Sequence, residues 1–167
     1  MSNVISCRVV NASPLIFLTK LGLLEVLRVL DAPVLVPDAV LAEISRRNAP
    51  DPVLEALLDN SEWIHVTPTP AIPHVVLVWD LHAGESAVLA VAREQPNSMA
   101  ILDDQAARRC ARVLNIPTQG TLGLILVAKH TGMVPAVRPV LSRLREEGMY
   151  MSHRLENQIL EAAGESI

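Results

Sequence analysis

Hydrophobic residues recur along the chain in two patterns, short continuous runs and longer stretches with helical spacing. The short runs predict five buried β-strands, at residues 8–10, 34–36, 63–66, 99–102 and 116–118. The longer stretches predict helices between and after them, at residues 13–22, 23–30, 37–47, 51–60, 83–94, 104–115, 121–132, 137–148 and 154–165. Apolar strands separated by helices are typical of an α/β domain with a mostly parallel sheet.

Proline and glycine residues refine this outline. Ser13 is the expected N-cap of the first helix, with Pro14 at its first position, and Gly22 interrupts that helix. The proline-rich stretch 65–79 is expected to be a surface excursion before the second half of the chain. No repeat or linker divides the sequence, so we expect a single domain over residues 1–167.

Composition limits the class of protein. Hydrophobic residues make up 50% of the 167 residues, yet no apolar run approaches the roughly 20 residues needed to span a bilayer. The start of the chain lacks the pattern of a signal peptide, and Cys7 and Cys110 are expected to be reduced, buried thiols. These features predict a cytoplasmic protein with no membrane association.

Charge gives a weaker indication. The formal net charge is −4, which is unlike a general nucleic-acid binder but is compatible with metal-binding acids beside a local basic patch. With one Phe, one Tyr and two Trp, the chain has little material for a platform on which bases could stack.

Polar groups follow several predicted strands, and the carboxyl ends of parallel strands form the ligand-binding edge of such a sheet. Asn11 follows the first strand, and Asp103 and Asp104 follow the fourth. Glu43 lies on the helix after the second strand, and Glu85 begins the helix at residues 83–94. One amide and four carboxylates are therefore candidates for a common site.

Each acid also has an ordinary explanation. Glu43 fits a solvated helix position, and Glu85 lies in a first helical turn, where the macrodipole favours a negative charge. An N-cap role explains Asp103 or Asp104, but not both, because adjacent like charges repel each other.

The Arg residues fit solvated helix faces, or else they hold a phosphate backbone near the acids. The Arg residues concerned are Arg46, Arg47, Arg108, Arg109 and Arg112.

Clustered carboxylates suit metal-dependent phosphodiester hydrolysis. Mg²⁺ and Mn²⁺ are hard cations held by a few carboxylates and several waters, and they lower the pKa of water and neutralise charge on phosphate. No zinc-type His/Cys spacing, Walker lysine loop or nucleophile elbow competes with this interpretation. The two glycines of "GTLG" (120–123) are expected to allow close helix–sheet packing, with phosphate contact as the alternative.

Several stretches in order resemble the PIN-domain ribonuclease superfamily, in particular its VapC-like prokaryotic toxin branch. They are "VVNASPLIFLTKLGLLEVL", "VLVPDAVLAEI", "AGESAVLAVA", "AILDDQAARRCARVLNIPTQGTLGLILVAKHTG" and "VRPVLSRLREEGMYMSHRLENQIL", which together cover nearly the whole chain. The resemblance implies a PIN-like three-layer α/β/α sandwich with about five strands. It also implies an endoribonuclease that acts as the toxin of a toxin–antitoxin pair, with a small antitoxin partner and a homodimeric state.

The resemblance also assigns residues. Asn11, Glu43, Glu85 and Asp104 match the metal-binding positions, Asp103 is an additional acid, and Ser13 sits where a hydroxyl often lies near the metal. Asn11 departs from the family pattern, because an amide stands where the first aspartate is expected and brings no charge to Mg²⁺ or Mn²⁺. The alternative hypothesis is therefore a catalytically weak or inactive PIN fold that binds RNA or a protein partner.

Overall fold

The central sheet has five parallel strands in the order β3-β2-β1-β4-β5. The computed structural model describes residues 4–29, 31–47 and 51–166. The strands are β1 (Cys7–Val10), β2 (Val34–Pro37), β3 (Ile64–Thr67), β4 (Ser98–Ile101) and β5 (Thr118–Gln119). All five predicted strands are confirmed, with ends displaced by one or two residues.

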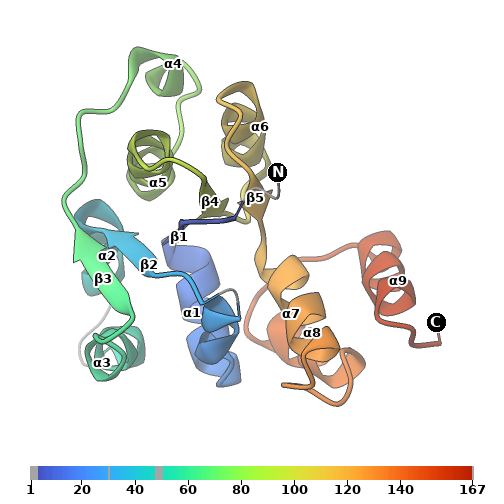
Figure 1. Ribbon diagram of the computed structural model, residues 1–167. Helices are drawn as coiled ribbons and strands as arrows, with labels where there is room; N and C mark the ends of the chain where they lie inside the picture. Colours follow the sequence, from blue (N-terminus) through green and yellow to red (C-terminus); the bar gives the residue numbers. More distant parts are fainter. Residues whose placement is uncertain (1–3, 30, 48–50, 167) are drawn as a thin grey trace.

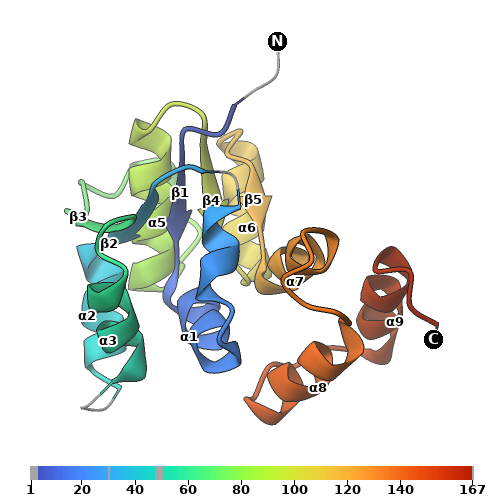
Figure 2. The ribbon, with the colours of Figure 1, turned by 60° about the horizontal axis from the view of Figure 1, so that its bottom comes forward.

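Helices cover both faces of this sheet. They are α1 (Ala12–Leu21), the 3-10 helix η1 (Leu24–Arg28), α2 (Asp38–Ser45), α3 (Pro52–Asp59), α4 (His74–Leu77), α5 (Ala83–Glu94), α6 (Gln105–Val113), α7 (Thr121–His130), α8 (Arg138–Glu146) and α9 (His153–Ala162). Figure 1 shows α5 and α6 on one side of the sheet and α1 and α7 on the other. This arrangement confirms the three-layer α/β/α fold, and Figure 2 shows α8 and α9 beyond α7.

The start of the first helix differs from the prediction. Asn11, with extended backbone angles, is the N-cap of α1, and the helix begins at Ala12, so Ser13 is not the cap. Pro14 occupies the third helical position without penalty, because the first N–H groups of a helix have no partner inside it. Gly22 ends the helix in the left-handed conformation with φ 68°, as its position in the sequence predicts.

Three other segments are shorter or more ordered than expected. The stretch 23–30 forms the 3-10 helix η1 rather than an α-helix, and its Leu30 lies outside the described residues. Helix α2 ends at Ser45, so Arg46 and Arg47 follow it. The proline-rich stretch 65–79 contains most of β3 and the single turn of α4.

The core lies between the sheet and its two helical layers. All four residues of β1 are buried, including Arg8, which donates a hydrogen bond to the carbonyl of Leu27 and so ties β1 to η1. Cys7 and Cys110 are free and buried, as predicted, and burial raises the pKa of both thiols. None of the helices within the described residues has the length and apolar character to cross a membrane.

Candidate active site

The candidate residues gather at the carboxyl ends of β1 and β4, which are neighbours in the sheet. Val10 pairs with Ile101, and the N–H of Asn11 donates to the carbonyl of Ile101 at 3.1 Å. Asn11 and the Asp103–Asp104 pair therefore leave adjacent strands at nearly the same level. The shared edge expected for a parallel sheet is present.

Asn11, Glu43 and Gly84 form the first group at this edge, which we call the Asn11 cluster. A Cβ atom on Gly84 would lie 2.5 Å from Oε2 of Glu43 and 2.8 Å from Oδ1 of Asn11. Both oxygen atoms thus approach the bare face of Gly84, at the start of α5. Packing of α2 against α5 brings Glu43 to this position.

The Asn11 side chain is unusual in its hydrogen bonding. Only 7% of Asn11 is exposed, and its Oδ1 has no hydrogen-bond partner among the described residues. A buried acceptor without a partner costs about 1–3 kcal/mol of stability. Such a group needs an explanation, and a bound water or cation beside Glu43 would supply one.

Asp103 forms a second group with Ser13 and Thr121, which we call the Asp103 cluster. Its Oδ1 accepts from the backbone N–H of Thr121 at 2.7 Å, and its Oδ2 accepts from the Thr121 hydroxyl at 2.6 Å. The Ser13 hydroxyl lies 3.4 Å from the same Oδ2. Since Thr121 is fully buried, the carboxylate is held in one orientation by the protein alone.

Gly120 gives the "GTLG" stretch a different role from the one expected. A Cβ on Gly120 would lie 2.9 Å from Nη1 of Arg108 and 3.0 Å from Oδ1 of Asp103. The first glycine therefore makes room for two candidate side chains, while Gly123 faces the side chain of Gln119. Gln119 belongs to β5, and a Cβ on Gly123 would lie 3.1 Å from its Cγ, so the close helix–sheet packing that the sequence predicted is present at the second glycine.

Asp104 and Glu85 act as helix caps. Oδ1 of Asp104 accepts from the N–H of Ala107 at 2.8 Å, which confirms an N-cap role for one of the two adjacent aspartates. Oε2 of Glu85 accepts from the N–H of His82 at 3.1 Å. Burial raises the pKa of the Glu85 carboxyl, and the nearby negative charge of Asp104 raises it further.

The candidates thus converge in pairs rather than as one group. Within residues 4–29, 31–47 and 51–166, no three His, Cys, Asp or Glu side chains lie close enough to hold a metal ion between them. Asn11 and Glu43 both approach Gly84, Asp103 lies beside Ser13, and Glu85 is within electrostatic range of Asp104. The metal-binding assignment of these residues stays a prediction.

The basic candidates surround these pairs. Arg108 lies beside Asp103 across Gly120, whereas Nη2 of Arg109 lies 3.4 Å from Oε1 of Gln105 on its own helix. Arg46 and Arg112 are exposed. Arg47 pairs with Glu43 at 3.5 Å, as the local explanation of this Arg predicts.

Sequence reasoning missed Gly84 and Thr121. Gly84 directly precedes Glu85 at the start of a helix, where a residue without a side chain allows close approach, and this position was a usable signal. Thr121 contacts Asp103 from 18 positions away in the chain, and nothing in the local sequence indicates that contact.

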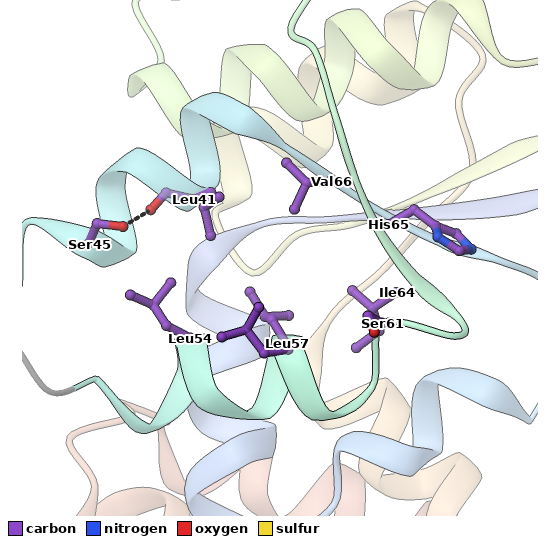
Figure 3. Close-up of a pocket in the computed structure, with 9 residues that line it drawn as sticks. Leu41, Ser45, Leu54, Leu57, Ser61, Ile64, His65 and Val66 are labelled. Carbon is purple, nitrogen blue, oxygen red and sulfur yellow. Dashed lines mark hydrogen bonds between the residues drawn. The ribbon is translucent and has the colours of Figure 1, made fainter.

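A separate apolar groove of about 540 Å³ lies at the β3 edge of the sheet, between α2, α3 and β3. Figure 3 shows Leu41, Leu54 and Leu57 along its walls, with Val66 above them. None of the candidate acids lines this groove. It is therefore not part of the candidate active site.

Comparison with known proteins identifies one family. A family model described as a PIN domain matches residues 7–165, which is nearly the whole chain. A search of curated proteins gives no match. The family match agrees with the five-stranded parallel sheet and with the position of the candidate acids at its carboxyl edge.

Proposed function

Because the chain belongs to the PIN-domain family, whose members are generally nucleases, we propose that it is an endoribonuclease that depends on Mg²⁺ or Mn²⁺. The observation that carries the proposal is that Asn11 Oδ1 and Glu43 Oε2 both approach the bare face of Gly84 at the carboxyl edge of the sheet. The amide oxygen is buried and has no partner among the described residues, so it is available to a cation.

The donor set fits a hard divalent cation. Asn11 and Glu43 offer only oxygen, and Mg²⁺ commonly keeps several waters while one or two carboxylates bind it. Two protein ligands therefore suffice, and a group of three acids is not required. When bound, such a cation supplies a lowered pKa for water and neutralises charge on a phosphodiester.

The surrounding residues have separate roles in this proposal. Asp103, fixed by Thr121, holds a negative charge in one position near the cation without needing a ligand to orient it. Arg108 lies beside it and is exposed, so its guanidinium can contact a phosphate. Glu85 and Asp104 position the first turns of α5 and α6, and Arg109, Arg112 and Arg46 add positive charge around the edge.

The biological role proposed here is that of a toxin in a toxin–antitoxin pair. It rests on the resemblance to VapC-like proteins, and with it come a small antitoxin partner and a homodimer. An adjacent short reading frame that encodes an antitoxin-like protein would support this role. Copurification of the two products would test it directly.

A second candidate function is a PIN fold that binds RNA or a protein without cleaving RNA. Two observations favour it: Asn11 brings no charge, and no three acidic side chains meet within the described part of the chain. Calorimetric titration separates the two functions, since a binding module need not take up Mn²⁺ at millimolar concentration.

The decisive experiment measures RNA cleavage by the purified protein with Mn²⁺ or Mg²⁺. We expect cleavage by the wild type, and about a hundredfold loss in Glu43→Gln, because a misplaced or neutral ligand removes the cation from its position. Glu94→Gln, at the exposed far end of α5, is the matched control and should cleave normally. Absence of cleavage by the wild type, or full activity in Glu43→Gln, would refute the nuclease.

A further inference from the structure

A second concavity adjoins the Asp103 cluster and is distinct from the apolar groove at β3. It has a volume of about 520 Å³ and is bounded by the first turn of α6, the end of β5, the first turn of α7 and the segment 149–159. Asp103 itself lines this pocket, together with Arg108 and Gly120, which lie beside it. Whatever fills the pocket therefore lies next to the candidate active site.

The wall of this pocket changes from polar to apolar. Asp103, Gln105, Arg108 and Gln119 supply charge and amide groups near the strand ends. Leu122, Met149 and Ile159 supply hydrocarbon farther along. A ligand that suits both parts has a flat or apolar body, hydrogen-bonding edges and a negative charge.

Tyr150 stands at this pocket with its side chain in solvent. It is the chain's single tyrosine and is 91% exposed, more than any other exposed large hydrophobic residue of the described chain. Its neighbours hold it in place: Met151 is buried, Met149 packs against the core, and the N–H of Met149 donates to the carbonyl of Leu144 at 2.9 Å. The fold thus holds the backbone on both sides of Tyr150, and the exposed ring itself contributes little to the core.

We infer that this pocket binds an unpaired RNA nucleotide next to the scissile phosphodiester, with its base stacked on Tyr150. Aromatic stacking is the usual way in which proteins hold splayed-out RNA bases, and an amide side chain can both donate to and accept from a base edge. Arg108 lies where the pocket meets the acids, so it can contact the nucleotide's phosphate. A base in a duplex is already paired and stacked, and cannot enter.

The location of this nucleotide beside a cleaved phosphodiester rests on the proposed function, but the test of the pocket does not require cleavage. The probe is a fluorescein-labelled single-stranded oligoribonucleotide of mixed sequence, compared with a blunt duplex of the same sequence. Binding is measured by fluorescence anisotropy in EDTA, where a metal-dependent nuclease leaves the probe intact.

We expect Tyr150→Ala to weaken single-strand binding about tenfold, because stacking on one base is lost. Tyr150→Phe should bind like the wild type, since it keeps the ring. Leu58→Ala, which removes a 75% exposed apolar side chain from α3, is the control and should have no effect. Duplex binding should be the same in all four proteins.

Three outcomes would overturn the inference: wild-type protein that does not bind the single strand, Tyr150→Ala that binds it normally, or an equal loss of duplex binding. A change of oligomeric state in Tyr150→Ala with unchanged RNA binding, seen by light scattering, would show a protein interface instead. If the wild type cleaves RNA but Tyr150→Ala binds the single strand normally, the nucleotide-binding role of the pocket is refuted and the nuclease activity is not. If Tyr150→Ala selectively loses binding but the wild type cleaves no RNA, the nuclease activity is refuted and the binding role of the pocket is not.

Discussion

The two clusters at the carboxyl edge of the sheet differ in how their oxygen atoms are satisfied. In the Asp103 cluster, both carboxylate oxygens accept hydrogen bonds from Thr121, and the Ser13 hydroxyl lies near one of them. In the Asn11 cluster, the amide oxygen of Asn11 is buried beside Glu43 and accepts nothing within the described residues. The clusters follow neighbouring strands, so the difference is local.

This difference separates positioning from binding. An acid held by a buried N–H and O–H keeps its orientation with or without a ligand, as preorganised electrostatic groups do. A buried acceptor without a donor lowers the stability of the folded protein by about 1–3 kcal/mol, and a ligand that binds to it can restore this stability. We therefore expect variants of the Asp103 cluster to change stability, and variants of the Asn11 cluster to change metal binding.

The largest effect is expected from Gly84→Ala. The added methyl would lie 2.5 Å from Oε2 of Glu43 and 2.8 Å from Oδ1 of Asn11, so at least one of these groups must move. Glu43 is half-buried at the end of a flexible chain and is the one expected to yield. A displacement of about 1 Å can cost a hundredfold in activity, and we expect RNA cleavage and Mn²⁺ affinity to fall by about that factor.

The folded state should survive Gly84→Ala, because alanine is favoured over glycine in a helix by about 1 kcal/mol. Urea unfolding and Mn²⁺ calorimetry on one preparation measure both properties. Gly123→Ala is the control for metal binding, since its methyl meets only the side chain of Gln119. Wild-type Mn²⁺ affinity in Gly84→Ala would remove the Asn11 cluster from consideration as the metal site.

A smaller effect, on stability, is expected from Asp103→Asn. The change replaces a charged acceptor of two strong hydrogen bonds by an amide whose NH₂ group cannot accept, so we expect a loss of about 1–3 kcal/mol in the free energy of unfolding. Asp104→Asn is the matched control, because asparagine caps a helix as well as aspartate does. Its unfolding midpoint in urea should stay close to that of the wild type.

Equal destabilisation by Asp103→Asn and Asp104→Asn would contradict the assignment of Asp103 as the acid fixed by Thr121. It would also remove the contrast between the two clusters, since neither aspartate would then be specially held. The m-value must stay constant for this comparison to report stability alone.

Much of the fold follows from local patterns in the sequence. Continuous apolar runs predict β1 to β4 well, because strands covered on both faces exclude polar residues. Glycine and proline mark most helix ends, as Gly22 does for α1. The gathering of Asn11 and Asp103 at one edge also follows, because parallel topology puts the ends of neighbouring strands together.

The roles of individual side chains at that edge do not follow from the sequence. Asp103 and Asp104 are adjacent, and only the direction of each side chain decides which one caps α6 and which one meets Thr121. The predicted cap at Ser13 failed for a similar reason, since Pro14 is tolerated anywhere in the first turn. The low number of aromatic residues argued against a stacking platform for bases, but a single tyrosine can serve where the fold places it at a pocket. Tyr150 has that position because of the packing of Met149 and Met151, which the composition does not reveal.

The smallest effect, and the sharpest test of the contrast, is expected from Asn11→Asp. A carboxylate at this position adds a charged oxygen ligand, so we expect Mn²⁺ to bind about tenfold more tightly. Without metal the same carboxylate is buried near Glu43, and like charges repel, so the metal-free variant should unfold more easily than the wild type. Excess Mn²⁺ should restore its stability, because a ligand that binds only the folded state stabilises it. Asn115→Asp, on an exposed turn, adds the same charge away from Glu43 and should leave Mn²⁺ affinity unchanged. If Mn²⁺ affinity and metal-free stability are both unchanged in Asn11→Asp, the unpartnered oxygen of Asn11 belongs to a turn residue and not to a metal site.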